Sequence, residues 1–145
     1  MNSDLNFTGA NEIKQWHDTL PLRYRYSLGV SGQKFSNALK SGRLVAFECP
    51  KCGKAYIIPT LFCPDCFRET DATRDVPAEG RVYSFTSSGD ETVVIVRFEG
   101  IQGGLIHRLK KGETVTVDDR VRVVFRPQAE RTGDLTDITY FEKVS

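Results

Sequence analysis

The sequence lacks an excess of charge of either sign. Its 145 residues include 20 Lys and Arg against 19 Asp and Glu, which leaves a formal net charge of +1. Proteins that bind polyanions through bulk charge carry a clear basic excess. The near-neutral balance therefore excludes a general polyanion binder, and a nucleic-acid role would require a local basic patch.

Long apolar runs are also missing. The longest, residues 93–96, has the length of a strand, whereas a membrane span needs about 20 apolar residues. The segment from Met1 to Leu5 lacks a basic start followed by an apolar stretch, so it shows no signal peptide. These absences predict a cytoplasmic protein that contacts no membrane, whose four cysteines remain reduced.

Common catalytic motifs do not occur either. The sequence has no nucleophile elbow, P-loop, zinc-protease helix motif or dinucleotide-binding glycine motif. Its two histidines, His17 and His107, lie far apart. His107 falls within a predicted strand, where a half-exposed structural position is favoured over a catalytic base. We therefore expect a protein without enzymatic activity.

The strongest feature that is present is a pair of cysteine motifs. Cys49-Pro-Lys-Cys52 is followed after ten residues by Cys63-Pro-Asp-Cys66. Each CxxC turn directs two thiolates toward one point, and two turns supply the four sulfurs of a tetrahedral zinc site. Gly53 suits the tight backbone turn that follows the second sulfur. The spacing predicts a zinc ribbon with Cys49, Cys52, Cys63 and Cys66 as ligands.

Other interpretations of the cysteines remain open at this level. Iron can occupy a site of four thiolates, and a single CxxC can be a redox dithiol, although two CxxC turns in one short span argue against redox chemistry. A catalytic zinc keeps an open coordination position, which four cysteines do not leave. We therefore expect structural zinc. The loop at 54–62 is apolar rather than basic, which suits contact with a protein or small molecule better than contact with phosphate.

The remaining sequence divides around this segment. Ile13, Trp16, His17 and Leu20 recur at helical spacing before Pro21. A second helix is expected with Phe35, Ala38 and Leu39 on one face. Ser31 is its expected N-cap and Gly42 its expected C-terminal stop. The alternating segment 22–28 between the two helices is expected to be extended.

The second half of the chain predicts strands separated by turns. The candidates are residues 81–87, 92–98, 104–109, 120–127 and 135–141. Five short strands suit a small barrel, for which the OB-fold is the commonest solution. We therefore predict a mainly β protein with N-terminal helices at 1–45, a zinc ribbon at 46–75 and a five-stranded OB-fold barrel at 76–145.

Three features together resemble the DUF35 family. They are the aromatic N-terminal segment from Tyr24 to Leu39, the paired cysteine motifs, and the sequence Gly-Arg-Val-Tyr-Ser-Phe-Thr at 80–86, which is similar to that family's entry strand. The resemblance implies a rubredoxin-like zinc ribbon followed by an OB barrel. It also implies a non-catalytic protein that binds acyl-CoA or CoA and docks beside a thiolase-type or other acyl-CoA enzyme.

The barrel offers groups that suit such a ligand. Arginines bind phosphate, and an aromatic or apolar groove accommodates adenine and the pantetheine arm. From a wider set of basic residues that includes Arg81 and Arg97, the residues expected to bind the ligand are Tyr83, Phe85, Arg108, Arg120 and Arg122. Each also has a simpler interpretation, because the arginines suit a solvated strand face and the two aromatics, which share one face in a regular strand, suit a core.

A second function comes from a different class. OB-folds often bind single-stranded nucleic acid by stacking bases on aromatic side chains in a basic groove, and Tyr83, Phe85, Arg120 and Arg122 suit that purpose as well. The net charge of +1 disfavours this alternative.

Overall fold

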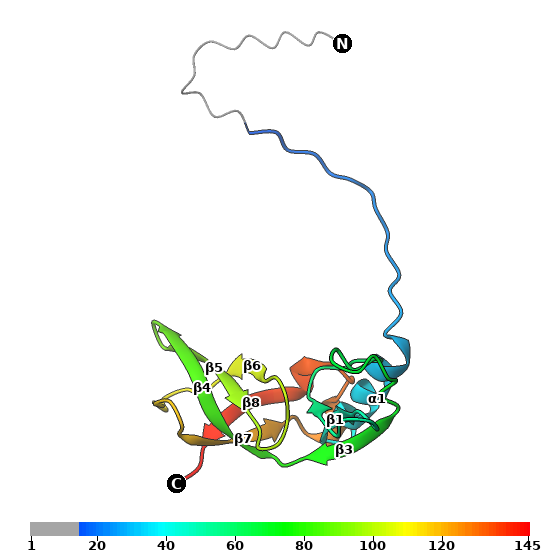
Figure 1. Cartoon of the computed structure of the whole chain (residues 1–145). Coiled ribbons are helices and arrows are strands. Elements are labelled where there is room, and N and C mark those ends of the chain that lie inside the picture. Colours follow the sequence, from blue (N-terminus) through cyan, green and yellow to red (C-terminus); the bar gives the residue numbers. More distant parts are fainter. Residues whose placement is uncertain (1–14) are drawn as a thin grey trace, which may run out of the picture.

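Strands dominate residues 15–145, the part of the chain that the computed structural model describes. They form two antiparallel sheets, one of three strands and one of five, preceded within this range by one α-helix (Figure 1). The predicted class, mainly β with a zinc ribbon and a five-stranded OB-like domain, is confirmed. No helix in residues 15–145 is long and apolar enough to cross a membrane.

Residues 15–28 form an arm without regular secondary structure that leads away from the folded body (Figure 1). The helix expected around Trp16, His17 and Leu20 is therefore absent from the described residues, and Ile13 lies outside them. Forming a short helix is unfavourable unless its apolar face packs against something. Trp16 is 83% exposed, so no such packing is available here.

The helix α1, Gly29–Lys40, buries the predicted face of Phe35, Ala38 and Leu39. It ends as expected at Gly42, which adopts a φ of +69°. The amide of Gly42 donates to Leu39 O and the next amide donates to Ala38 O, each at 2.9 Å, which is the pattern of a Schellman cap.

The start of the helix differs from the prediction. Ser31 is not the N-cap but lies two residues inside the helix, where its buried hydroxyl donates to the carbonyl of Thr60 at 3.0 Å. A residue inside the first turn has a helical backbone and is not in the N-cap position, and the residue at the N-cap, Leu28, provides no side-chain hydrogen bond. The serine instead joins α1 to the ribbon.

The three-stranded sheet has the order β2-β1-β3, with β1 at Leu44–Glu48, β2 at Ala55–Tyr56 and β3 at Ala72–Val76. Four of the five residues of β1 are buried. Its apolar residues follow one another without alternation, because α1 packs against the strand and its side chains join the common core.

The five-stranded sheet has the order β6-β5-β4-β7-β8, with all neighbouring strands antiparallel. The strands are β4 at Glu79–Ser88, β5 at Glu91–Arg97, β6 at Leu105–Arg108, β7 at Arg120–Phe125 and β8 at Ile138–Lys143. A parallel bridge between Leu109 and Phe141 brings the two edge strands together, which closes the sheet in the manner of an OB barrel. The last strand starts later than predicted because residues Leu135–Asp137 form a 3-10 turn, η2.

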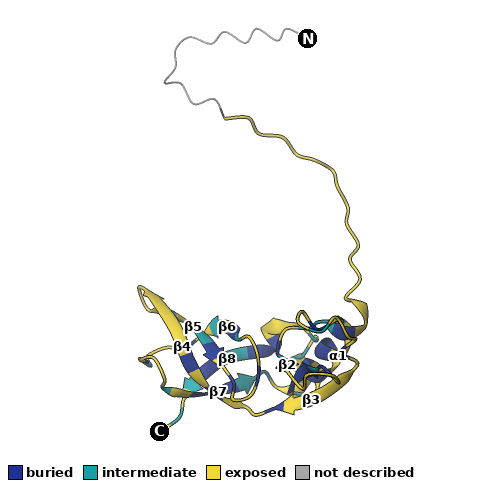
Figure 2. Ribbon diagram, in the orientation of Figure 1, coloured by how far each residue is buried: buried dark blue, intermediate teal, exposed yellow. Residues whose placement is uncertain are grey.

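Ribbon and barrel share one hydrophobic core, visible as the dark blue segments that run through both parts in Figure 2. Backbone hydrogen bonds reinforce the contact: the amide of Gln102 donates to Ala55 O at 2.7 Å, and that of Ile57 donates to Gln102 O at 3.1 Å. A Cβ on Gly103 would lie 3.3 Å from Ile57 Cγ2. The group that lies close to this glycine is thus a side chain of the chain's own ribbon.

The loop between β7 and β8 joins the barrel to α1. Gly133 has a φ of +92°, and a Cβ there would lie 2.4 Å from Ser36 Oγ and 2.8 Å from Lys40 Cε. Asp137, which is fully buried, holds the loop by accepting hydrogen bonds from the amides of Thr132 and Gly133, both at 2.7 Å. The loop therefore fits the helix only if position 133 has no side chain.

Replacing Gly133 by Ala tests this contact. We expect Gly133→Ala to lower the free energy of unfolding by about 2–4 kcal/mol, because a left-handed backbone costs about 1–2 kcal/mol and the clash with α1 adds about as much. Gly112→Ala is the matched control, since Gly112 also has a positive φ, +84°, but has open space around it. Equal losses for the two variants in urea unfolding would show that the contact with α1 contributes nothing.

Candidate metal centre and barrel groove

The two cysteine turns have the same backbone geometry. In the first, the amide of Cys49 donates to Lys54 O and the amide of Gly53 donates to Cys49 O. In the second, Cys63 and the residues four and five positions after it repeat both bonds, and all four distances lie between 2.8 and 2.9 Å. Each turn orients two sulfurs toward the other turn, as the spacing predicts.

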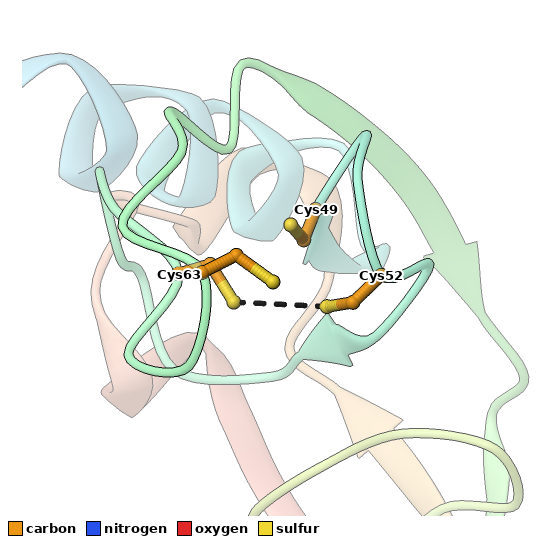
Figure 3. Close-up of side chains that lie close together, drawn as sticks. Cys49, Cys52 and Cys63 are labelled. Atoms are coloured by element: carbon orange, nitrogen blue, oxygen red, sulfur yellow. Dashed lines mark hydrogen bonds between the residues drawn. The ribbon is translucent and has the colours of Figure 1, made fainter.

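The four cysteine sulfurs lie within 4.8 Å of one another. Figure 3 shows Cys49, Cys52 and Cys63 with their sulfurs close together, and the Sγ atoms of Cys52 and Cys63 are 3.8 Å apart. Tetrahedral Zn–S bonds of about 2.3 Å place sulfurs about 3.8 Å apart. The residues therefore fit a zinc ion, and together they form the zinc-binding site of a zinc ribbon. Four sulfurs fill a tetrahedral shell, so the site suits a structural ion.

A hydroxyl that the sequence analysis did not identify modifies this site. The hydroxyl of Tyr56 donates to Cys63 Sγ at 3.3 Å, and this hydrogen bond lowers the pKa of the Cys63 thiol to about 6. The side chain of Cys52 hydrogen-bonds Cys66 and raises the pKa of that thiol to about 12. Because neighbouring thiolates repel one another, full ionisation of the four sulfurs requires a bound cation.

One residue of the second turn carries an unusual backbone. Gly53 and Phe67 occupy equivalent positions, immediately after the second cysteine of each turn, and both have a positive φ, +72° and +58°. Glycine adopts this conformation freely, whereas a phenylalanine there is strained. Phe67 is nevertheless 79% exposed and gains little from burial. No sequence pattern revealed this residue, because its conformation follows from the geometry of the turn.

The predicted ligand residues of the barrel do not converge on one place. Tyr83 and Arg120 line one groove. Arg122 lies beside it but forms an ion pair with Glu142 on β8. Arg108 lies in a separate depression on β5 and β6.

We expected Tyr83 and Phe85 to share one strand face, but they lie on different faces. The pairing of β4 with β5 shifts by one residue between Val82 and Ser84, so a β-bulge lies at Tyr83. Phe85 pairs with the buried Val94 and shares its face, while Tyr83 lies against the exposed Arg97. A bulge changes the alternation of side chains, which is why regular period-2 counting assigned Tyr83 and Phe85 to one face.

The groove that contains Tyr83 and Arg120 has a volume of about 740 Å³ and lies over the start of β4, the end of β5 and the start of β7. This size is within the range of small-molecule sites. Its charged lining consists of Glu79, Arg81, Arg97, Glu99, Asp118 and Arg120. The carboxylates Glu99 and Asp118 were not anticipated, because strand pairing rather than any local motif brings them to the arginines.

The two histidines occupy unremarkable positions. His17 is exposed in the arm. His107 is half-buried in β6, with Nε2 at 3.2 Å from Leu135 O and its ring edge-on to Phe141. Burial lowers the pKa of His107. A neutral imidazole held between β6 and η2 agrees with the structural position favoured from the sequence.

Comparison with known proteins defines the class of this fold. A family model described as ChsH2, rubredoxin-like zinc ribbon domain, matches residues 36–71. A crystal structure of a protein with unknown function from the DUF35 family of Sulfolobus solfataricus superposes with a TM-score of 0.64 at 19% identity, covering 80% of this chain and 87% of that one. The fold and the four-sulfur site thus define a rubredoxin-like zinc ribbon joined to an OB-like barrel.

A second structure extends the comparison. One described as the Ltp2-ChsH2(DUF35) aldolase has a TM-score of 0.58 at 19% identity, covering 82% of this chain and 98% of that one. No curated protein matches the sequence. The matched ribbon and the two DUF35 structures confirm the resemblance of this chain to the DUF35 family.

Removal of the metal should unfold the ribbon. We expect a chelator to lower the melting temperature and reduce the near-ultraviolet circular dichroism, because the segment cannot keep four thiolates together without a cation. Re-addition of zinc should restore both signals at one ion per chain, and Cys63→Ser should be insensitive to either treatment. Unchanged spectra and melting temperature after complete metal removal would contradict a structural site.

The Tyr56 hydroxyl should strengthen metal binding. We expect Tyr56→Phe to weaken zinc affinity about tenfold in competition with a chromophoric chelator, since partners of metal ligands contribute about 10–100-fold. Tyr24→Phe makes the same chemical change in the arm and should leave the affinity unaltered. Equal affinity in the two variants would show that the Tyr56–Cys63 hydrogen bond does not stabilise the thiolate.

Proposed function

We propose that this chain is a non-catalytic module that binds acyl-CoA and docks onto an acyl-CoA enzyme of the thiolase or aldolase type. The observation that carries the proposal is the set of exposed apolar side chains on the arm and on the ribbon, which together we call the docking surface. It comprises the exposed side chains of Leu20, Leu22, Tyr24, Tyr26, Leu28, Leu61, Phe62 and Phe67. Exposed groups of apolar side chains mark sites of protein interaction, and both the arm and the ribbon carry such a group.

The arm has the pattern of a segment that folds on binding. Its apolar residues occupy every second position from Leu20 to Leu28, and Arg23 and Arg25 stand between them. The rings of Tyr24 and Tyr26 stack with centroids 5.9 Å apart, so they lie on the same side of the extended chain. An alternating segment of this kind suits pairing with a sheet edge or groove of a partner that carries acidic groups beside an apolar floor.

The ribbon continues this surface. The arm enters α1 at Gly29, and the first turn of α1 contacts the ribbon loop through the hydrogen bond of Ser31 with Thr60. Phe67 lies beyond that loop in its left-handed conformation. Strained, exposed aromatic residues are typical of recognition sites rather than of scaffolds, because folding alone gains nothing from them.

Two observations support the class of partner and the absence of catalysis in this proposal. One structure with this fold is described as the Ltp2-ChsH2(DUF35) aldolase. Four sulfurs leave a zinc ion no open position for substrate. Chemistry therefore belongs to the partner enzyme, and this chain contributes binding of the partner and of the acyl-CoA substrate.

The docking proposal is tested with Phe67→Gly. This variant removes the aromatic ring, yet its free energy of unfolding should stay within about 1 kcal/mol of wild type, because relief of the left-handed backbone offsets the greater freedom of unfolded glycine. We expect tagged full-length chain to co-purify with an acyl-CoA enzyme identified by mass spectrometry, and Phe67→Gly to bind the purified enzyme at least about tenfold more weakly.

Ile106→Ser is the control for that experiment, because Ile106 is also an exposed apolar residue, at 65%, but lies on the barrel. It should bind the partner as wild type does. Recovery only of proteins unrelated to acyl-CoA chemistry, or equal binding by Phe67→Gly and wild type, would contradict the proposal.

A further inference from the structure

The groove over β4, β5 and β7 contains a row of three arginines that only the strand register reveals. Arg81 on β4 pairs with Arg97 on β5 and, on its other side, with Arg120 on β7. Arg120 forms an ion pair with Glu79. Among residues 15–145, Arg81 and Arg97 have no carboxylate oxygen within 4.0 Å. Arg81 donates one N–H to the carbonyl of Asp118 at 2.9 Å, and the guanidinium groups of these two paired residues retain their other donors for an anion from outside the chain.

One of these arginines is held in place by an aromatic ring. Arg97 Cζ lies 3.5 Å from the centroid of the Tyr83 ring, which orders the guanidinium through a cation–π contact while its N–H edges stay free. Tyr83 follows the buried Val82, so its ring faces outward into the groove on the same side as Arg81. The ring remains 51% exposed, so it can receive a second planar group.

Carboxylates in the same groove restrict the kind of anion that fits. Glu99 and Asp118 line it and, among the described residues, form no ion pair. A nucleic-acid backbone or an inorganic polyphosphate offers only acceptors and would be repelled by these carboxylates. A single nucleotide combines phosphate oxygens with amino and hydroxyl donors and a base that stacks, so it complements arginines, carboxylates and Tyr83 together.

From this arrangement we infer that the groove binds a phosphorylated adenosine, with Arg81 and Arg97 holding phosphate and Tyr83 stacking on adenine. The identity of the nucleotide as the 3′,5′-ADP end of CoA rests on the proposed function. Arg120 is the third arginine of the row, and it stays paired with Glu79. Arg108 and Arg122 are less suited, because Arg108 lies in the smaller depression of about 330 Å³ and Arg122 is neutralised by Glu142.

The inference is tested by titration calorimetry of 3′,5′-ADP into zinc-loaded full-length protein. We expect saturable binding at one site per chain. Arg81→Met and Arg97→Met should each weaken it about tenfold or more, since charge-assisted hydrogen bonds are lost, and Tyr83→Leu should weaken it about fivefold or more through lost stacking. Arg108→Met is the matched control on the same barrel and should stay within about twofold of wild type.

The outcomes separate the site from the proposed function. No saturable binding of 3′,5′-ADP by wild type, or equal binding by the arginine variants and wild type, overturns the assignment of the groove. Acetyl-CoA binding that is unchanged in Arg81→Met and Arg97→Met also overturns it, while leaving acyl-CoA binding as a function intact.

Arginine-dependent 3′,5′-ADP binding without any partner enzyme would support the groove and contradict docking. Tighter, salt-sensitive binding of oligothymidine than of 3′,5′-ADP would contradict the nucleotide assignment and favour single-stranded nucleic acid.

Discussion

The mutual repulsion of four neighbouring thiolates is the constraint on which the rest of this structure depends. Sulfurs within 4.8 Å of one another cannot all ionise unless a cation lies between them. The ion therefore determines whether the two cysteine turns close. Those turns also fix β2 against β1, and Ala55 of β2 and Ile57, the residue after β2, form the backbone hydrogen bonds with Gln102 in the barrel. One metal site thus supports the junction between the ribbon and the barrel.

Spacing and periodicity predicted the parts of the fold that depend on local sequence. Two CxxC turns must bring their sulfurs together whatever surrounds them, and alternating strands such as Arg120–Phe125 reveal one buried face. The prediction of a helix around Trp16 was wrong because the stability of such a helix depends on a surface to pack against, and the spacing of apolar residues does not show whether one exists. The prediction of Ser31 as the cap was wrong because the helix begins at Gly29, which leaves Ser31 inside the first turn with its hydroxyl donated to the carbonyl of Thr60.

The candidate ligand site was the least predictable part, and the reason is geometric. Arg81, Arg97 and Arg120 come from three strands, and only the register places them in one row. The bulge at Tyr83 then reverses the face that regular alternation assigns to Phe85. A single inserted residue in a strand moves every later side chain relative to its partners, so residue type alone identifies candidates for a site without locating it.

The sequence Gly-Arg-Val-Tyr-Ser-Phe-Thr at 80–86 shows how closely core and groove are connected. A Cβ on Gly80 would lie 2.6 Å from Val96 Cγ1 and 2.7 Å from Arg97 O, so only glycine lets β5 approach β4 at this point. Val82 is then fully buried in the barrel, while Arg81 and Tyr83 on either side of it line the groove. Because the close approach at Gly80 positions Arg97 beside Tyr83, the residues that close this end of the barrel also build the surface that we assign to nucleotide binding.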